Sequence, residues 1–204
     1  MRSGQAASRG QDDVPRRGRP RSAETDSRIQ GAALGLLHDH GPLAVTVEAV
    51  AQRSGVAKTT IYRRYADRDE LLRSALGATI GEPGEPPEGG PRERIRWALD
   101  QLWRRMADVL GPGGLAAVLG DTERDFTELF RSVLTPYTDA LTALIDADVA
   151  VGVLRPGLDA DATVSVLVGA YLGELLRRGS VGADFEDTCL DLMWVAMTAT
   201  SRED

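Results

Sequence analysis

The chain has 204 residues, enough to bury the core of one large domain or the cores of two smaller ones. No apolar run approaches the roughly 20 residues that span a bilayer. The N-terminal arginines also lack the apolar stretch of a secretory signal, so we expect a cytoplasmic protein with no membrane partner. Cys189 is the only cysteine, which excludes an intrachain disulfide and a thiolate cluster for zinc. Its apolar surroundings favour a buried position.

The charge of the chain is unevenly distributed. A net charge of -7 argues at first against a nucleic-acid partner, because DNA affinity depends largely on neutralising phosphates. However, residues 1–73 carry 13 Lys and Arg against 9 Asp and Glu, whereas residues 74–204 carry 11 against 22. The first part is therefore suited to face DNA and the second to face away from it.

The N-terminal segment is polar and basic. Residues 1–25 are rich in Gly, Ser, Pro, Arg and Asp, and we expect them to form a disordered tail. Helical spacing of apolar residues begins near Ser27 and continues to His40, where Gly41 and Pro42 supply a stop. Within the tail, a short run resembles the Arg-Gly-Arg-Pro element that enters narrow A·T-rich minor grooves. The arginines of this expected arm are Arg16, Arg17, Arg19 and Arg21. A basic tail without that role is the alternative.

Three further helices are predicted before residue 81. Thr46 is a suitable N-cap for a helix that ends at Ser54 and Gly55. A second short helix is predicted from about Ala57 to Tyr65. A longer one over residues 68–80 follows Asp67, which forms a capping-box-like start with the glutamate three residues later. Residues 26–80 are therefore predicted to form one unit that includes this connecting helix.

The second half of the chain is predicted to be helical as well. Residues 81–91 read GEPGEPPEGGP and form the clearest internal linker. In residues 92–204 we predict a long helix that a Gly-Pro-Gly-Gly run closes at 111–114, then a short helix around 115–119. A segment over 126–145 follows, which Pro136 kinks or divides. Two final helices over 160–177 and 185–198 follow the candidate N-caps Asp159 and Asp184. The predicted fold class is all-α.

A helix-turn-helix pattern lies in the first unit. This motif needs a small residue in its first helix, a glycine in the turn and apolar anchors after it. Ala51, Gly55, Val56 and Ile61 meet those needs, and Gly55 can adopt a left-handed conformation. Cations suit phosphates or guanine edges, and threonines suit phosphates, base edges or the thymine methyl. The outward positions on the second helix are Lys58, Thr59, Thr60, Arg63 and Arg64. The alternative, a merely solvated helix face, is disfavoured by the turn spacing.

The run GVAKTTIYRRYADRDEL over residues 55–71 resembles the recognition-helix signature of TetR (tetracycline-repressor-like) regulators, and the resemblance extends over 27–80. Arg64 stands where the family usually has His, and Tyr65 where it has Phe, which leaves neighbouring base preferences open. We expect Tyr65 to be buried and Tyr62 to lie at the phosphate edge. The resemblance implies phosphate contacts from Thr46, Lys58, Tyr62 and Arg68, and base contacts from Thr59, Thr60 and Arg63.

The last two predicted helices are candidates for dimerisation. The final helix is apolar almost all round, so one face can cover its own domain and another is expected to meet a second chain. In the helix before it, Gly169 and Gly173 would allow close approach of a neighbour, with local packing as the alternative. The pair resembles the four-helix dimer interface of TetR-type regulators, and residues 153–169 loosely resemble one C-terminal subgroup. The predicted interface residues are Val168, Tyr171, Leu172, Leu190, Trp194 and Met197.

A sensor pocket is expected between the long helices of this half. The large side chains available to line it are Trp97, Trp103, Met106, Phe126, Phe130 and Tyr137, each of which is also a candidate for plain core. The acidic balance favours a neutral or cationic effector. Residues 68–80 form the only predicted helix that touches both the recognition helix and the long helix, so we expect it to transmit ligand binding to the DNA-reading units.

No constellation supports chemistry. The sequence lacks a G-x-S-x-G elbow, a Glu-x-x-His pair and a glycine-rich phosphate loop, so we expect neither an enzyme nor a cofactor. His38 and His40 do not converge on a helix, so no metal site is expected. The predicted function is a sequence-specific transcriptional regulator: a homodimeric repressor released from a palindromic DNA operator by a small-molecule effector. A regulator that dimerises but binds no ligand is the alternative.

Overall fold

The computed structural model describes residues 20–120 and 123–198. Its regular structure is helical throughout those ranges, which confirms the predicted all-α class. None of the helices described is both long and apolar enough to cross a membrane. The elements are α1 (Pro20–His40), the 3-10 helix η1 (Pro42–Ala44), α2 (Val47–Ser54), α3 (Lys58–Tyr62), α4 (Arg68–Ile80), α5 (Pro91–Gly120), α6 (Arg124–Ala150), α7 (Ala160–Arg178) and α8 (Phe185–Thr198).

The first helix begins earlier than the sequence pattern predicts. It starts at Pro20 rather than near Ser27, so the expected tail over 1–25 overlaps its first turns. Proline is well suited to the first position of a helix, because its fixed φ is already helical and its missing N–H needs no partner there. Arg21, predicted in an extended arm, therefore lies in a helical turn, whereas Arg16, Arg17 and Arg19 lie outside the described residues.

Local capping sets the ends of the short helices. The Thr46 side chain accepts a hydrogen bond from the backbone of Ala49 at 3.1 Å, and Gly55 ends α2 with φ 68°. Asp67 caps α4 by accepting from the Glu70 N–H at 2.8 Å, as predicted. The α3 helix ends at Tyr62, three residues before its predicted end, because the chain turns there.

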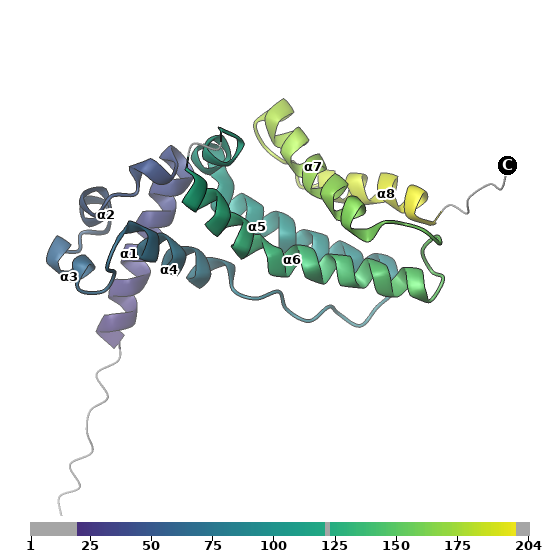
Figure 1. Ribbon diagram of the computed structural model, residues 1–204, viewed down its shortest axis with the longest axis horizontal. Helices are drawn as coiled ribbons and strands as arrows, with labels where there is room; N and C mark the ends of the chain where they lie inside the picture. The colour runs from purple at the N-terminus through teal and green to yellow at the C-terminus, as the bar shows by residue number, and fades with distance from the viewer. Residues whose placement is uncertain (1–19, 121–122, 199–204) are drawn as a thin grey trace, which may run out of the picture.

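The connection between α4 and α5 determines the direction of the long helices. Residues 81–90 run along one side of the α5–α6 pair, so that α5 starts far from the unit formed by α1, α2 and α3, here called the three-helix unit, and runs back to it (Figure 1). Pro91, predicted to close the linker, is instead the first residue of α5. Gly84 lies against the Trp97 indole, where an added Cβ would stand 3.4 Å from the ring.

The long helix α5 is bent where it meets α1. Gly111 has φ 34° and ψ -178°, which divides the element into two helical segments at the predicted glycine run. A Cβ added at Gly113 would overlap the backbone nitrogen of Gly41, so the two main chains are in direct contact. The α1 helix therefore packs on α5 as well as on α4. This corrects the expectation that only residues 68–80 touch both parts of the molecule.

The remaining helices match their predicted ranges closely. The α6 helix is one continuous element through Pro136 and is not divided there. Leu134, Tyr137 and Leu141 are buried on either side of the proline, and this packing offsets the loss of one backbone hydrogen bond. Asp159 caps α7 by accepting from the Ala162 N–H at 2.9 Å, as predicted.

Candidate functional site

The helix-turn-helix of α2 and α3 is held together from behind its exposed face. Ile61 is fully buried and Tyr65 is 7% exposed, so both anchor α3 to the core, and the burial predicted for Tyr65 is confirmed. In the turn, Ser54 accepts from the Val56 N–H at 3.2 Å. Arg28 of α1 donates to the Ser54 carbonyl at 2.6 Å, which ties the turn to the first helix.

The outer face of α3 presents the residues predicted to meet DNA. Lys58, Thr59 and Arg63 are exposed, Tyr62 is 56% exposed, and Thr60 is half-buried. Thr59 and Arg63 are four positions apart and therefore share one side of the helix. The α3 helix is therefore short, is anchored to the core by its buried residues, and exposes a polar, partly cationic surface.

Three of the predicted DNA-contacting cations are ion-paired within the chain. Lys58 Nζ lies 2.8 Å from a carboxylate oxygen of Glu48, and Arg64 lies 2.8 Å from Asp26. The Lys58 hydrogen bond also lowers the pKa of Glu48. The Lys58–Glu48 pair is exposed and screened by water, so a phosphate can replace the carboxylate at small cost.

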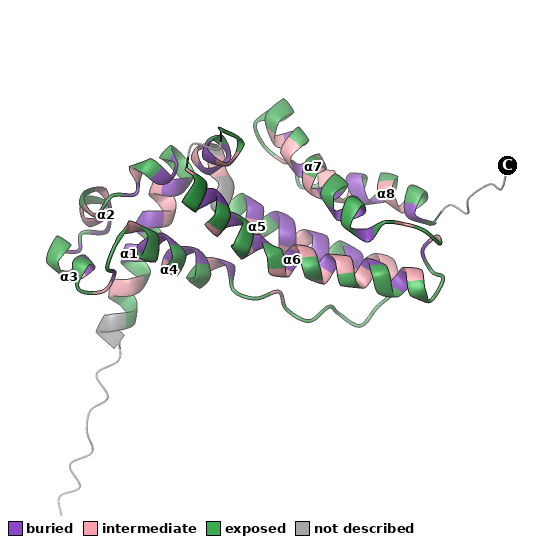
Figure 2. Cartoon of the chain, in the orientation of Figure 1, coloured by how far each residue is buried: buried purple, intermediate pink, exposed green. Residues whose placement is uncertain are grey.

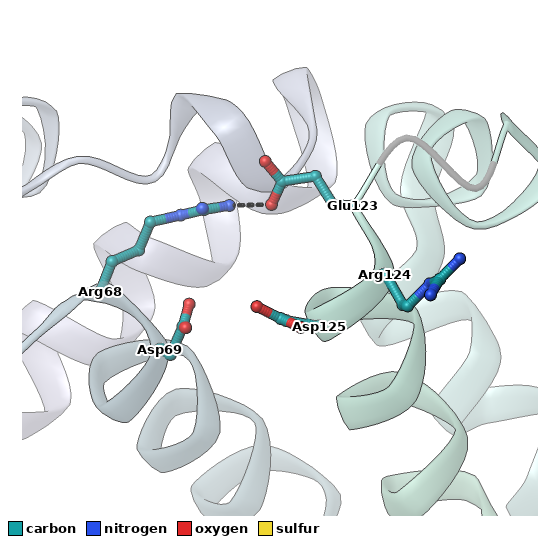
Figure 3. Close-up of a pocket in the computed structure, with 5 residues that line it drawn as sticks. All are labelled: Arg68, Asp69, Glu123, Arg124 and Asp125. Carbon is teal, nitrogen blue, oxygen red and sulfur yellow. Dashed lines mark hydrogen bonds and ion pairs between the residues drawn. The ribbon is translucent and has the colours of Figure 1, made fainter.

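The third pair joins α4 to the segment just before α6. Arg68 at the start of α4 bonds Glu123 just before α6, and its Nε donates to the Pro42 carbonyl at 3.2 Å (Figure 3). Asp69 and Asp125 point toward one another below this pair and line the same hollow of about 240 Å³. Glu123 was not among the predicted site residues. Its separation of 55 positions from Arg68 leaves no local sequence signal of the contact.

Sequence comparison agrees with this geometry. Residues 29–75 match the family model described as bacterial regulatory proteins, tetR family. Residues 29–75 therefore form a TetR-type DNA-binding domain. This match confirms the resemblance stated from the α3 signature, and the chain is a DNA-binding transcriptional regulator.

Similarity to individual TetR-type proteins extends beyond that match. The chain is 26% identical over 173 residues to the uncharacterized HTH-type transcriptional regulator YdeS of Bacillus subtilis (strain 168), which covers 80% of this chain and 84% of YdeS. It is 37% identical over 105 residues to the HTH-type transcriptional repressor KstR of Rhodococcus jostii (strain RHA1), covering 50% of this chain and 48% of KstR. The transcriptional regulator FadR from Bacillus subtilis, solved with stearoyl-CoA, superposes with a TM-score of 0.63 at 17% identity over 81% of this chain and 96% of FadR. At 17% identity, the similarity to FadR shows a shared fold only.

The six residues predicted to line a pocket lie mainly in the core of this regulator. Trp97 is half-buried, and the other five, Trp103, Met106, Phe126, Phe130 and Tyr137, are buried. Trp103 stacks on Phe185 of α8 with ring centroids 5.9 Å apart and meets Tyr171 of α7 edge-on at 5.5 Å.

Tyr137 is also a connector between helices. Its hydroxyl donates to the Ile80 carbonyl at the end of α4. Arg105 of α5 donates to the Thr79 carbonyl at 3.3 Å and lies 5.9 Å from the Tyr137 ring centroid. The C-terminal end of α4 is therefore fastened to α5 and α6, and Arg68 fastens its N-terminal end.

A groove that the sequence did not predict lies beside the bend of α5. It has a volume of about 630 Å³ and is bounded by the last turn of α1, both segments of α5 and the C-terminal part of α7. None of the six predicted pocket residues is among the described residues that line it. The sequence carried one relevant signal, the Gly-Pro-Gly-Gly run at 111–114, but nothing local indicated that the end of α1 would pack there.

The last two helices bury part of the predicted dimer interface within the chain. Tyr171 is 5% exposed and Leu190 and Met197 are fully buried, which places them in their own core instead of on a partner-facing surface. Val168, Leu172 and Trp194 are half-buried. The sequence showed α8 to be apolar all round, and the packing of α8 decides which residues face inward.

Other apolar residues of these helices are exposed. On α7, Val166, Gly169 and Gly173 recur at i, i+3 and i+7 and form one exposed stripe. On α8, Leu192 is 72% and Val195 is 68% exposed. An added Cβ would meet no atom within 4 Å at either glycine, so local packing within the described chain does not explain them. We call these residues of α7 and α8 the apolar stripe; Figure 2 shows the exposed positions of both helices in green.

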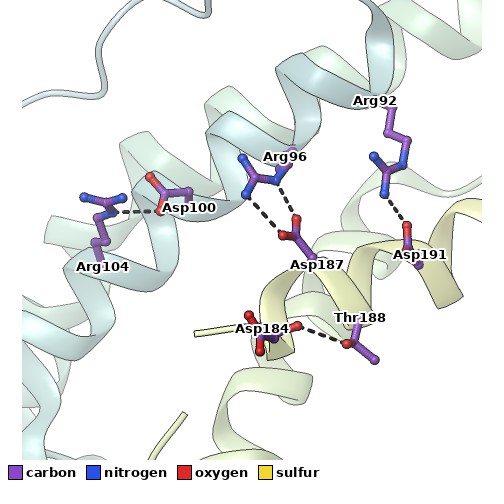
Figure 4. A network of polar contacts seen from close by, with 8 residues as sticks. All are labelled: Arg92, Arg96, Asp100, Arg104, Asp184, Asp187, Thr188 and Asp191. Atoms are coloured by element: carbon purple, nitrogen blue, oxygen red, sulfur yellow. Dashed lines mark hydrogen bonds and ion pairs between the residues drawn. The ribbon is translucent and has the colours of Figure 1, made fainter. Parts of the chain in front are cut away.

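Ion pairs also link α8 to α5. Arg96 donates to Asp187 at 2.5 Å, and Arg92 bonds Asp191 one turn further along (Figure 4). Beside this network, one carboxylate oxygen of Glu186 is buried without a hydrogen-bond partner among the described atoms. Burial, followed by repulsion from Asp100, raises the pKa of Glu186 to about 7.

Proposed function

We propose that this regulator is a homodimeric repressor that acts in the cytoplasm and that a small-molecule effector releases it from a palindromic operator. The observation that carries the proposal is the rigidly seated α3, which exposes Lys58, Thr59 and Arg63 on its outer face. The relative KstR is named a repressor, which favours repression over activation.

The exposed side chains suggest a division of roles at the operator. Lys58, Tyr62, Thr46 and Arg68 are assigned to phosphates, which position the protein without reading sequence. Thr59, Thr60 and Arg63 are assigned to base edges. Arg64, which bonds Asp26, is assigned to support α3 and to reach a phosphate only when that pair opens.

Dimerisation is inferred from the apolar stripe. Leu192 and Val195 expose more than two thirds of their surface, and a second chain would remove that apolar surface from water. A two-fold dimer would present two α3 helices to successive major grooves about 34 Å apart. We assign residues 20–80 to DNA binding, 91–198 to dimerisation and sensing, and 81–90 to the connection.

Release by an effector is supported by the joints between the two parts. The C-terminal end of α4 is fastened to α5 and α6, its N-terminal end bonds Glu123 just before α6, and α1 contacts the bend of α5. A ligand that binds one arrangement of these helices better than another would change operator affinity by that difference. FadR, which shares the fold, was solved with stearoyl-CoA. A regulator that binds no ligand is the alternative.

Genomic selection followed by footprinting tests the proposal. The purified full chain is used to capture genomic DNA fragments, and the captured sites are footprinted. We expect two symmetric protected half-sites with centres about one helical turn apart, and a two-fold dimer by sedimentation. A single protected half-site bound by a monomer would contradict the proposal.

A further inference from the structure

We propose that the groove beside the α5 bend binds an uncharged, mainly apolar small molecule. The site is distinct from the pocket expected among the core aromatic residues, because none of those six residues lines it. As an effector site the groove rests on the proposed function, whereas ligand binding itself can be tested without DNA.

The size and surface of the groove match a small ligand. Its volume of about 630 Å³ falls within the range of roughly 300–1,000 Å³ that is usual for ligand sites. Leu115, Leu119, Leu175 and Leu176 contribute to its walls. Leu119 and Leu176 are 56% and 67% exposed, so an apolar ligand would remove leucine surface from water.

The lining also indicates the charge of the ligand. No Asp, Glu, Lys or Arg is among the described residues that line the groove, so a charged group placed inside would lose hydration without meeting an ion-pair partner on these walls. The polar side chains present are those of His38, Tyr171 and Ser180. These three offer hydrogen bonds to a molecule that carries one or two neutral polar groups. The broader expectation of a neutral or cationic effector is thereby narrowed to a neutral one.

The position of the groove connects a ligand to the DNA-binding unit. Gly111 lies so close to His38 that an added Cβ would overlap the imidazole ring, so the groove reaches the contact between α1 and α5. The same α1 helix holds the recognition unit through Arg28 on the Ser54 carbonyl and Asp26 on Arg64. A molecule in the groove therefore touches both sides of the joint whose rearrangement would move α3.

A pair of naphthalene dyes provides the direct test. Phenyl-naphthylamine is neutral and apolar, and anilinonaphthalene sulfonate is the same ring system with a negative charge. Both are titrated by fluorescence against the full chain. We expect saturable binding of the neutral dye and at least tenfold weaker binding of the sulfonate.

Two substitutions locate the dye. Ala116→Phe fills the groove and Leu119→Asp puts a charge into it, and both positions are exposed, so folding should be retained. Each is expected to weaken binding of the neutral dye at least tenfold. The matched controls Ala143→Phe and Leu43→Asp, at exposed positions outside the groove, should leave binding unchanged. Thermal unfolding of each variant confirms that it is folded.

Three results would overturn the proposal. These are the absence of saturable binding to the native chain, equal binding by groove and control variants, and tighter binding of the charged dye. A loss of dimerisation in Ala116→Phe without any dye binding would mean that a second copy covers the groove. Because no DNA is used, failure of the operator experiment would leave the groove result standing, and the reverse also holds.

Discussion

The three-helix unit around α3 and the α7–α8 pair differ in what they leave exposed. In the first, Ile61 and Tyr65 are buried, and the recognition helix turns a polar and cationic face outward. In the second, Leu192 and Val195 remain mostly exposed although Leu190 and Met197 of the same helix are fully buried. The first surface suits a charged polymer, and the second suits another apolar surface.

The two regions also use charge differently. Around α3, carboxylates such as Glu48 and Glu123 neutralise cations that we assign to DNA, so these pairs compete with phosphate. Between α5 and α8, Arg96 and Asp187 hold two helices together. The difference leads to four predictions, beginning with the surface whose disruption should cost most.

Placing charge in the apolar stripe should separate the dimer. We expect Leu192→Glu combined with Val195→Glu to raise the dimer dissociation constant at least a hundredfold, because two apolar contacts are lost and charges would be buried. Sedimentation equilibrium measures the change. Leu43→Glu, at a residue 68% exposed on η1, is the matched control and should leave the dimer intact. A dimer unaffected by the double substitution would show that the stripe is not the interface.

Substitutions on α3 should separate affinity from sequence preference. Lys58→Ala is expected to weaken binding about tenfold on every DNA sequence and to reduce the salt dependence, because one phosphate contact per subunit is lost. Thr60→Ala should instead relax preference at particular base pairs, by about 1–3 kcal/mol. Binding to operator and random DNA at several salt concentrations distinguishes the two. Equal losses on both DNAs for both variants would contradict the assignment.

Removing the charge at Glu123 should release Arg68 for DNA. We expect Glu123→Gln to strengthen operator binding about threefold, since Arg68 then loses its carboxylate partner and can contact phosphate at lower cost. Glu128→Gln, at an exposed position on α6, is the control. Weaker operator binding by Glu123→Gln would mean that the pair positions α4 for DNA and does not compete with it.

The smallest effect concerns stability and pH. The pKa of Glu186 is about 7 in the folded chain against an ordinary value of 4.5, so between these values the folded state binds more protons than the unfolded state. Ionising Glu186 therefore lowers the free energy of unfolding as the pH rises from about 4.5 to 7. Above pH 7 this loss of stability is complete and stays constant.

A neutral substitution removes that penalty. Above pH 7, Glu186→Gln should raise the free energy of unfolding by about 1 kcal/mol, a value that is reduced because the side chain is partly exposed to water. The gain should shrink as the pH falls below 7, because native Glu186 then becomes protonated. Urea unfolding at several pH values measures it, with Glu93→Gln on the exposed side of α5 as control. A gain that does not vary with pH would exclude titration of Glu186 as the cause.

The sequence by itself determined most helix boundaries and the DNA-binding motif. The bounds of α4 and α8, the Thr46 and Asp67 caps and the left-handed Gly55 agree with prediction, because capping and turn chemistry depend on residues within four positions of one another. The recognition helix was found for the same reason, since its glycine and anchors lie in one short run.

Where tertiary packing outweighs local signals, the sequence predictions were incomplete. The α1 helix extends to Pro20, and α6 continues through Pro136 because buried neighbours hold it straight enough to remain one helix. Periodicity identified the apolar residues of α7 and α8 but placed Tyr171 and Leu190 on the partner's side, because it gives no absolute orientation of a helix toward the core.

Contacts between distant segments were decided only by the tertiary structure. The pair of Arg68 with Glu123 and the contact of Gly113 with Gly41 depend on how the long helices cross and on a linker that returns α5 to α1. The groove beside Gly111 is formed from α1, α5 and α7 together. Helix crossing depends on side chains that interlock between elements, and no single segment of the sequence contains that information.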